Sequence, residues 1–174
     1  GYAAYYDGVP TEQSRVNEFG LYTYVINADN ATVTITDCLT SAGGNLQILD
    51  SIEGRSVTSI GDYAFENCGG LNSITIPDSI TSIGDYAFRG CHNVTNIFIG
   101  NGVTSIGDYA FDDCTTQSII IPDSVTSIGD YAFEATGAIN IIIGNGVISI
   151  GDYAFNGCRT QSIIIPDSVT SIGN

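Results

Sequence analysis

The chain has 174 residues, among them 19 acidic residues, four arginines and no lysine, which gives a formal net charge of -15. Such a charge disfavours binding to the phosphate backbone of nucleic acids and to anionic membrane surfaces. No segment approaches the roughly 20 apolar residues of a membrane-spanning helix. We therefore expect no nucleic-acid partner and no membrane insertion.

The amino-terminal third of the chain has its own pattern. Residues 21–26 and 32–36 are rich in β-branched and aromatic residues and predict a hairpin. Residues 41–44 predict a loop, and residues 46–50 resemble a degenerate first repeat strand. We interpret residues 1–56 as a cap, because the first coil of a repeat array would otherwise expose its core and its backbone edge.

From residue 57 onward the chain repeats itself. The heptapeptide Ser-Ile-Gly-Asp-Tyr-Ala-Phe occurs five times unchanged, and a sixth copy is begun. The copies begin at Ser59, Ser82, Ser105, Ser127, Ser149 and Ser171. Their spacings of 23, 23, 22, 22 and 22 residues are typical of a solenoid, in which each coil packs only on its neighbours. We predict five full coils and a truncated sixth over residues 57–174.

Each coil also contains an apolar pattern that predicts a strand. The pattern is L-x-x-L-x-L, as in Leu71, Ile74 and Ile76, with smaller residues at the first position of later coils. Alternate side chains of such strands face the core, and neighbouring coils pair in parallel about 4.8 Å apart. In the short return segment, we expect Gly61 to permit a tight corner and Asp62 to cap a single helical turn over residues 63–65.

The segments that follow the strands alternate between two forms. Three coils carry Pro-Asp-Ser, beginning at Pro77, Pro122 and Pro166, and two carry Gly-Asn-Gly, beginning at Gly100 and Gly144. Both forms are turn sequences. The true unit of the repeat is therefore a pair of coils.

The string Ile-Pro-Asp-Ser-Val-Thr-Ser-Ile-Gly-Asp-Tyr-Ala-Phe, with a cysteine three residues later, resembles the BspA-like leucine-rich repeat family. The alternating Ile-Gly-Asn-Gly coil fits the same family, and the resemblance covers roughly residues 20–174. It implies a leucine-rich-repeat solenoid with a parallel sheet on one face, short turns or single helical turns on the other, and a hairpin cap. It also implies a surface or secreted protein, mostly bacterial. Some members are described as adhesins for host matrix proteins such as fibronectin, and the family has no catalytic residues to carry over.

The outward side of the predicted sheet is the candidate binding surface. Its candidate residues are Thr75, Asn96, Phe98, Ser118, Ile120, Asn140, Ile142, Ser162 and Ile164. One column of this surface is apolar from Phe98 onward, and a contiguous apolar stripe usually marks an interface. The alternative is that isoleucine is present only because it suits strands.

A ladder of aspartates recurs with the heptapeptide. Its members are Asp62, Asp85, Asp108, Asp130 and Asp152. Stacked coils would place these carboxylates about 5 Å apart, with about 1 kcal/mol of repulsion between neighbours in water. Calcium could relieve this repulsion, but capping explains every copy without converging ligands. We therefore expect no metal.

Cysteine, tyrosine and histidine complete the candidate residues. Cys68, Cys91, Cys114 and Cys158 follow the repeat, and Cys38 lies in the cap. We expect small buried core residues, because parallel side chains meet disulfide geometry poorly, and five cysteines leave at least one unpaired. The tyrosine of each heptapeptide is expected to be partly buried against the next coil. His92 is the single histidine, so neither a histidine-based triad nor a metal cluster is expected.

These observations predict a non-catalytic protein-binding or adhesion module with no cofactor, which uses the exposed face of the repeat sheet. The alternative is a structural spacer or accessory domain of a longer extracellular protein or enzyme. Expected partners are an extracellular or host matrix protein, such as a fibronectin-like protein, or a polysaccharide. Self-association is a further expectation, through the sheet face or the uncapped carboxy-terminal coil, which stops inside a unit. The chain starts at Gly1 and has no Met, which suggests a trimmed segment of an extracellular or cell-surface protein.

Overall fold

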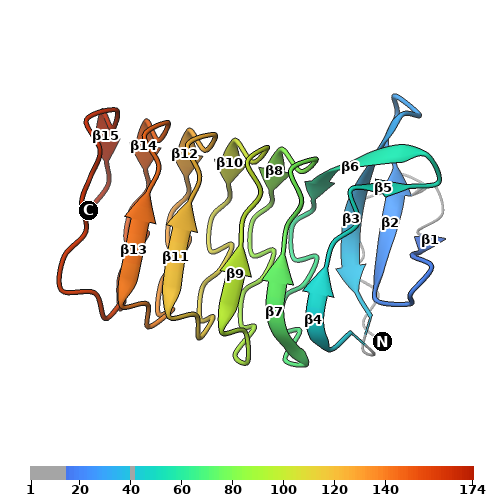
Figure 1. Cartoon of the computed structure of the whole chain (residues 1–174), viewed down its shortest axis with the longest axis horizontal. Helices are drawn as coiled ribbons and strands as arrows, with labels where there is room; N and C mark the ends of the chain where they lie inside the picture. Colours follow the sequence, from blue (N-terminus) through green and yellow to red (C-terminus); the bar gives the residue numbers. More distant parts are fainter. Residues whose placement is uncertain (1–14, 40–41) are drawn as a thin grey trace.

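A computed structural model describes residues 15–39 and 42–174 of the chain. Residues 1–14 of the predicted cap and residue 41 of the predicted loop lie outside them. The described chain is a right-to-left stack of coils in Figure 1, with the amino-terminal strands at one end and the last coil at the other. The predicted solenoid is confirmed.

A hairpin covers the first coil, as predicted. Strands β2 (Tyr22–Ile26) and β3 (Thr32–Cys38) pair antiparallel, and β1 (Arg15–Val16), which was not predicted, adds to β2. β3 then pairs in parallel with β6 (Arg55–Ile60), while β5 (Ser51–Ile52) pairs antiparallel with the same strand. The hairpin therefore continues the sheet that contains β6, and it protects the first edge of that sheet.

The sheet that carries the candidate surface is formed by one strand per coil. Its strands are β4 (Gly44–Gln47), β7 (Leu71–Thr75), β9 (Asn96–Phe98), β11 (Ser118–Ile121) and β13 (Asn140–Ile143). They confirm the L-x-x-L-x-L prediction for these coils, since the inward Ile74, Ile97 and Ile119 are buried. All pairings within this sheet are parallel.

The next strand, predicted over residues 160–165, does not form, and that prediction is wrong. The segment lies at the end of the stack, where it has a neighbouring coil on one side only. The Thr160 hydroxyl instead bonds locally, donating to the Ser162 carbonyl at 2.7 Å. Thr116 makes the equivalent bond to the Ser118 carbonyl at 2.9 Å although β11 forms. The missing neighbour on the outer side therefore accounts for the loss of the strand, and Ile164 is left 84% exposed.

The sheet is interrupted between β9 and β11, which are neighbours without ladder pairing. The coil length changes here, because Ile97 follows Cys91 by six residues whereas Ile119 follows Cys114 by five. Threonine hydroxyls bond to carbonyls at this step: Thr115 Oγ1 donates to the His92 carbonyl at 2.8 Å. The shortened coil thus keeps its contact with the previous one without a continuous ladder.

A second parallel sheet, which was not predicted, is formed by the Ser-Ile pair that opens each heptapeptide. Its strands after β6 are β8 (Ser82–Ile83), β10 (Ser105–Ile106), β12 (Ser127–Ile128), β14 (Ser149–Ile150) and β15 (Ser171–Ile172). Serine pairs with serine and isoleucine with isoleucine along the stack. Two residues are too few for alternation to be recognised in a sequence.

The rest of the heptapeptide forms a turn, and the predicted helical turn is absent. Tyr63 and its equivalents have φ values between 54° and 60°, a left-handed conformation that a helix cannot contain. Asp62 therefore does not cap its own coil. Its Oδ1 accepts the backbone N–H of Asp85 in the next coil at 2.9 Å, and each later aspartate bonds in the same way, ending at Asn174.

Backbone bonds reinforce this connection between coils. The Tyr63 N–H donates to the Asp85 carbonyl at 2.9 Å, and the Phe65 N–H donates to the Ala87 carbonyl at 2.7 Å. We call the stacked heptapeptides, residues 59–65 and their repeats, the heptapeptide wall. Every step between complete heptapeptides is closed by the same bonds.

The repeat glycine serves close stacking and not a tight corner, contrary to the prediction for Gly61. A Cβ on Gly84 would lie 2.6 Å from the Asp62 backbone nitrogen and would overlap Asp62 Oδ1. The glycine at this position has no positive φ, whereas the tyrosine two residues later does. The strain of a left-handed non-glycine residue thus falls on Tyr63 and its repeats.

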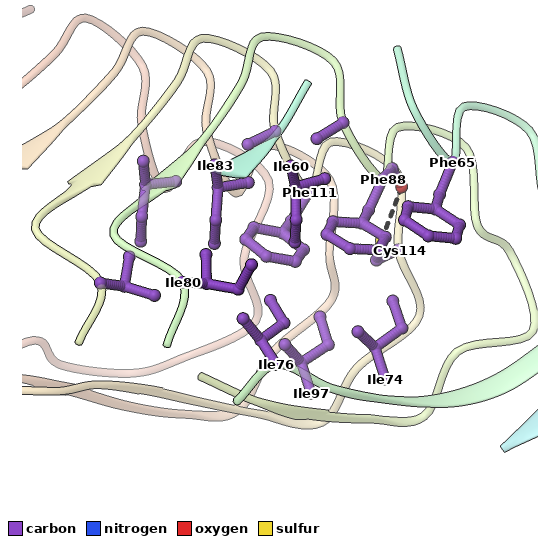
Figure 2. Close-up of a cluster of buried hydrophobic side chains, with 14 of the residues drawn as sticks. Ile60, Phe65, Ile74, Ile76, Ile80, Ile83, Phe88, Ile97, Phe111 and Cys114 are labelled. Carbon is purple, nitrogen blue, oxygen red and sulfur yellow. Dashed lines mark hydrogen bonds between the residues drawn. The ribbon is translucent and has the colours of Figure 1, made fainter. Parts of the chain in front are cut away.

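The core runs along the stack as columns of identical side chains. Phe65, Phe88 and Phe111 are fully buried and stack with ring centroids 5.0 and 5.2 Å apart. Figure 2 shows these rings beside the isoleucine columns, with the Cys114 thiol reaching the Phe88 carbonyl. Each coil therefore buries its apolar residues against copies of themselves.

The cysteines confirm one expectation and correct another. Cys91 and Cys114 are buried and free, as expected, and their thiols donate to the carbonyls of Phe65 and Phe88 in the preceding coil at 3.2 and 3.3 Å. Cys68, however, forms a disulfide with Cys38. Cys38 belongs to the hairpin and not to a neighbouring coil, so the two side chains do not point in parallel directions as those of stacked coils do.

The two turn sequences interlock. The Asn101 N–H donates to Asp78 Oδ1 at 2.6 Å, and a Cβ on Gly102 would overlap the Asp78 carbonyl. The same bond recurs from Asn145 to Asp123 at 2.7 Å. A Gly-Asn-Gly coil therefore fits closely on the Pro-Asp-Ser coil before it.

Candidate functional site

The outward side of β7, β9, β11 and β13, which we call the sheet face, carries a row of exposed apolar side chains. Phe98, Ile120 and Ile142 are 60%, 55% and 51% exposed. Ile120 and Ile142 are register partners, and Phe98 is the register partner of half-buried Thr75. The structure thus brings four of the candidate residues into one row across consecutive coils.

A polar row runs beside the apolar one. Ser118 and Asn140 are register partners, and Asn140 Nδ2 donates to Ser118 Oγ at 3.2 Å. Asn96 occupies the equivalent position on β9, where its Nδ2 donates to Thr95 Oγ1 at 3.0 Å. These amides and hydroxyls can bond to a ligand that lies along the apolar row.

The last two candidate residues lie elsewhere than predicted. Ser162 and Ile164 are exposed but belong to no strand, so they do not extend the rows of β11 and β13. A groove of about 590 Å³ separates them from β13. Its lining residues are Ile139, Asn140, Ile141, Ile142, Arg159, Thr160, Gln161, Ser162 and Ile164.

A second surface feature is the tyrosine ladder, formed by Tyr63, Tyr86, Tyr109, Tyr131 and Tyr153. Neighbouring rings stack with centroids 4.6–5.0 Å apart. The expected partial burial is confirmed for Tyr86, Tyr109 and Tyr131, whereas Tyr63 and Tyr153 at the ends of the ladder are exposed. Burial raises the pKa of Tyr109 and Tyr131, and the neighbouring tyrosines and carboxylates raise it further.

The column of side chains that follows the phenylalanine of each coil lies beside this ladder. The repeat pattern did not reveal this column, because its members differ in type from coil to coil. They are Glu66, Arg89, Asp112, Glu134 and Asn156. A search of the repeat for charge at one fixed position would have found them.

The described residues offer binding surfaces more readily than reactive groups. They contain no set of three His, Cys, Asp or Glu side chains placed to hold a metal ion. His92 is exposed, with Nδ1 3.6 Å from Asp113 Oδ2. The pKa of Cys114 is raised well above its usual value by its hydrogen-bonded neighbour Cys91 and by burial, so this thiol is a poor nucleophile.

Comparison with protein families gives a direct match. The model of the BspA type leucine rich repeat region matches residues 58–174 in six copies. The chain belongs to this family. The BspA-type repeat therefore accounts for the coils from residue 58 onward. A comparison with curated proteins gave no match.

Solved structures share the fold of this BspA-type chain. A leucine rich repeat protein of Treponema pallidum is 23% identical with a TM-score of 0.68, over 92% of this chain and 82% of that one. A leucine rich cell surface protein of Faecalibacterium prausnitzii is 27% identical with a TM-score of 0.66, over 93% and 51%. The pneumococcal vaccine antigen PcpA is 20% identical with a TM-score of 0.76, over 95% and 47%. The chain thus spans about half the length of the latter two.

The part of the chain that the structure describes contains no helix with the length and apolar character needed to cross a bilayer.

Proposed function

We propose that this chain is a non-catalytic binding module of a cell-surface or secreted protein, and that the sheet face is its binding surface. The observation that carries the proposal is the exposed row of Phe98, Ile120 and Ile142 on consecutive coils. A row of large apolar side chains on a rigid sheet is unfavourable in water unless a partner covers it. Its polar neighbours, Ser118 and Asn140, supply hydrogen bonds at the rim.

The spacing of the row favours an extended partner with a repeating surface. On β9, β11 and β13 each coil offers one large apolar side chain with a polar neighbour, which is asparagine or serine. Several weak contacts of one kind then add through avidity. Extracellular matrix proteins of the fibronectin type and polysaccharides both have repeating surfaces, and the apolar row favours the protein.

Two observations support an extracellular or cell-surface location. The Cys38–Cys68 disulfide joins the hairpin to the first coil, and structural disulfides persist mainly in oxidising compartments. The related Faecalibacterium structure is named a cell surface protein.

The near identity of the coils also favours a second role, that of a structural spacer or accessory domain in a longer protein. A spacer needs regular stacking and no particular surface. The two roles differ in whether changes on the sheet face alter binding.

The test is a surface-plasmon-resonance screen of the chain against immobilised matrix proteins and polysaccharides. The variant Phe98→Ser, Ile120→Ser and Ile142→Ser should lose the binding that the original chain shows. A matched control changes three exposed residues away from the sheet face, Thr104→Ser, Thr126→Ser and Ile148→Ser, and should bind normally. Equal binding by both variants would remove the sheet face as the binding surface, and no binding at all would favour the spacer.

A further inference from the structure

One edge of β13 is open and borders the groove between this strand and residues 160–164. β13 pairs with β11 alone, so its other edge has no ladder partner among the described residues. In the coil of β7, the Ile76 N–H donates to the Phe98 carbonyl of the next coil at 2.9 Å. Ile143 holds the position equivalent to Ile76, so its N–H points away from β11 in the same way, toward the groove side of the strand.

A carbonyl at the start of β13 is open as well. At two earlier steps the equivalent carbonyl accepts an N–H from the next coil: Asn72 from Thr95 and Gln117 from Ile139, both at 3.0 Å. The Ile139 carbonyl itself accepts no backbone N–H from the described residues. Unpaired backbone groups along a sheet edge form a template for an added strand.

The groove offers apolar contacts on both sides of this open edge. Ile142 on β13 is 51% exposed, Ile164 on the opposite wall is 84% exposed, and Ile139 at one end is 62% exposed. Because the side chains of a strand alternate, an added strand would place one set of its side chains between Ile142 and Ile164. β13 has four residues, which corresponds to a guest segment about 13 Å long.

Arg159 gives the groove its charge. The other three arginines lie within ion-pair distance of carboxylates, whereas no carboxylate of the described residues pairs with Arg159. None of the residues that line the groove is acidic. The Arg159 N–H donates to the Ala138 carbonyl at 2.8 Å, which holds this residue at the end of the groove where β13 begins. In a chain with 19 acidic residues, the groove is therefore a place where a partner's carboxylate meets a complementary charge.

We propose that the groove binds an extended segment of a partner protein, which adds to β13 as a strand and carries a carboxylate beside Arg159. Backbone hydrogen bonds supply the affinity, and the apolar contacts and Arg159 supply the selectivity. The inference rests on the proposed function, because it names the kind of segment that one end of the sheet face takes up. A polysaccharide has no backbone ladder to pair with β13, so the groove favours a protein partner.

The experiment is a nuclear-magnetic-resonance titration of the isotope-labelled full chain with the peptide acetyl-Glu-Ser-Ile-Thr-Ile-Thr-amide in about 50 mM salt, where screening is modest. In the parallel register of this sheet, the peptide serine pairs with Asn140 and its glutamate lies beside Arg159. Saturable shifts should be confined to the groove, and exchange of the Ile143 N–H with solvent should slow. A peptide with glutamine in place of glutamate should bind about three- to fivefold more weakly.

Arg159→Gln should weaken binding of the glutamate peptide by the same factor and leave binding of the glutamine peptide unchanged. The matched control Arg15→Gln makes the same change of charge on β1, at the opposite end of the stack (Figure 1). It should change the affinity by less than about 1.5-fold. A glutamate peptide N-methylated at its serine and first threonine cannot donate to β13 in this register and should not bind.

A double variant separates this inference from the proposed function. Phe98→Ser with Ile120→Ser leaves the groove intact, so this variant should bind the peptide normally while losing the binding of matrix proteins. Matrix binding that depends on Phe98 and Ile120, without any peptide binding, would overturn the groove proposal alone. Peptide binding without binding of any matrix protein would count against the proposed function alone.

Three further outcomes would overturn the proposal. The first is equal weakening by Arg159→Gln and Arg15→Gln, and the second is undiminished binding of the N-methylated peptide. The third is slowed exchange of the Ile143 N–H at high protein concentration without peptide, which would assign the groove to a second copy of the chain.

Discussion

The heptapeptide wall and the sheet face belong to the same coils, yet they are built differently. The heptapeptide wall repeats without change, and every step carries the same aspartate, tyrosine and phenylalanine bonds. The sheet face changes from coil to coil, is interrupted between β9 and β11, and lacks a strand at residues 162–165. One side therefore holds the stack together, and the other, which is the proposed binding surface, is free to vary.

The largest loss of stability should come from a change in the column of buried phenylalanines behind the heptapeptide wall. Phe111 is fully buried between Phe88 and Phe133. Phe111→Ala should lower the free energy of unfolding by about 3–5 kcal/mol, because it leaves a cavity in the stack. Ile120→Thr on the sheet face should change it by about 0.5 kcal/mol or less. Urea denaturation followed by circular dichroism measures both free energies of unfolding. Similar losses would mean that the core column and the sheet face contribute equally to stability.

The second effect concerns the hairpin end of the stack. Later cysteines bond to a carbonyl of the coil before them, whereas Cys68 is joined covalently to Cys38. Replacing both with serine should lower stability by about 3 kcal/mol, because the unfolded chain regains the freedom of a closed loop. Thermal unfolding with and without reductant tests this. An original chain unaffected by reductant would contradict it.

The third effect tests close stacking. A Cβ on Gly129 would lie 2.6 Å from the Asp108 backbone nitrogen and overlap its carboxylate, so Gly129→Ala should cost about 1–3 kcal/mol. Gly69 has no atom within 4 Å of the equivalent Cβ position and no positive φ. Gly69→Ala should therefore be tolerated, with a change of about 0.5 kcal/mol or less. Thermal unfolding curves of the two variants show whether close stacking or the lost backbone freedom of glycine determines the loss of stability.

The smallest effect separates hydrogen bonding from charge in the aspartate ladder. Asp108 Oδ1 accepts the Asp130 N–H at 2.8 Å. Asp108→Ala removes this bond and should cost about 1 kcal/mol. Asp108→Asn keeps an acceptor oxygen and should cost less. If denaturant titrations give the same loss of stability for the two variants, the charge of Asp108 matters more than its hydrogen bond.

The sequence was sufficient to predict the features that depend on the repeat spacing and on the alternation of inward and outward side chains along a strand. The solenoid, the hairpin and the strands of four coils follow from repeat spacing and from inward residues such as Ile74 and Ile119. The Ser-Ile strands escaped prediction because two residues show no periodicity. The conformation of Tyr63 escaped it because the bonds that hold the tyrosine in the left-handed region come from the next coil.

Pairing between distant segments was the other obstacle. Nothing in the spacing of Cys38 and Cys68 shows that the hairpin brings them together. The position of Ile164 depended on whether a strand at the end of the stack would form, which the local sequence does not decide. The exposed row at Phe98, Ile120 and Ile142 was predictable, because it needed only the alternation of each strand.

The interlocked turns restrict how such a protein can change its length in evolution. A Gly-Asn-Gly coil accepts the turn before it because Gly102 has no side chain to meet Asp78. Two Pro-Asp-Ser coils in succession would place serine where only glycine fits. Loss of a Gly-Asn-Gly coil from the middle would create that mismatch, whereas loss or duplication of a pair would preserve the alternation. Genes for this type of array should therefore vary in steps of two repeats, and an arrangement with an odd insertion should carry a compensating glycine.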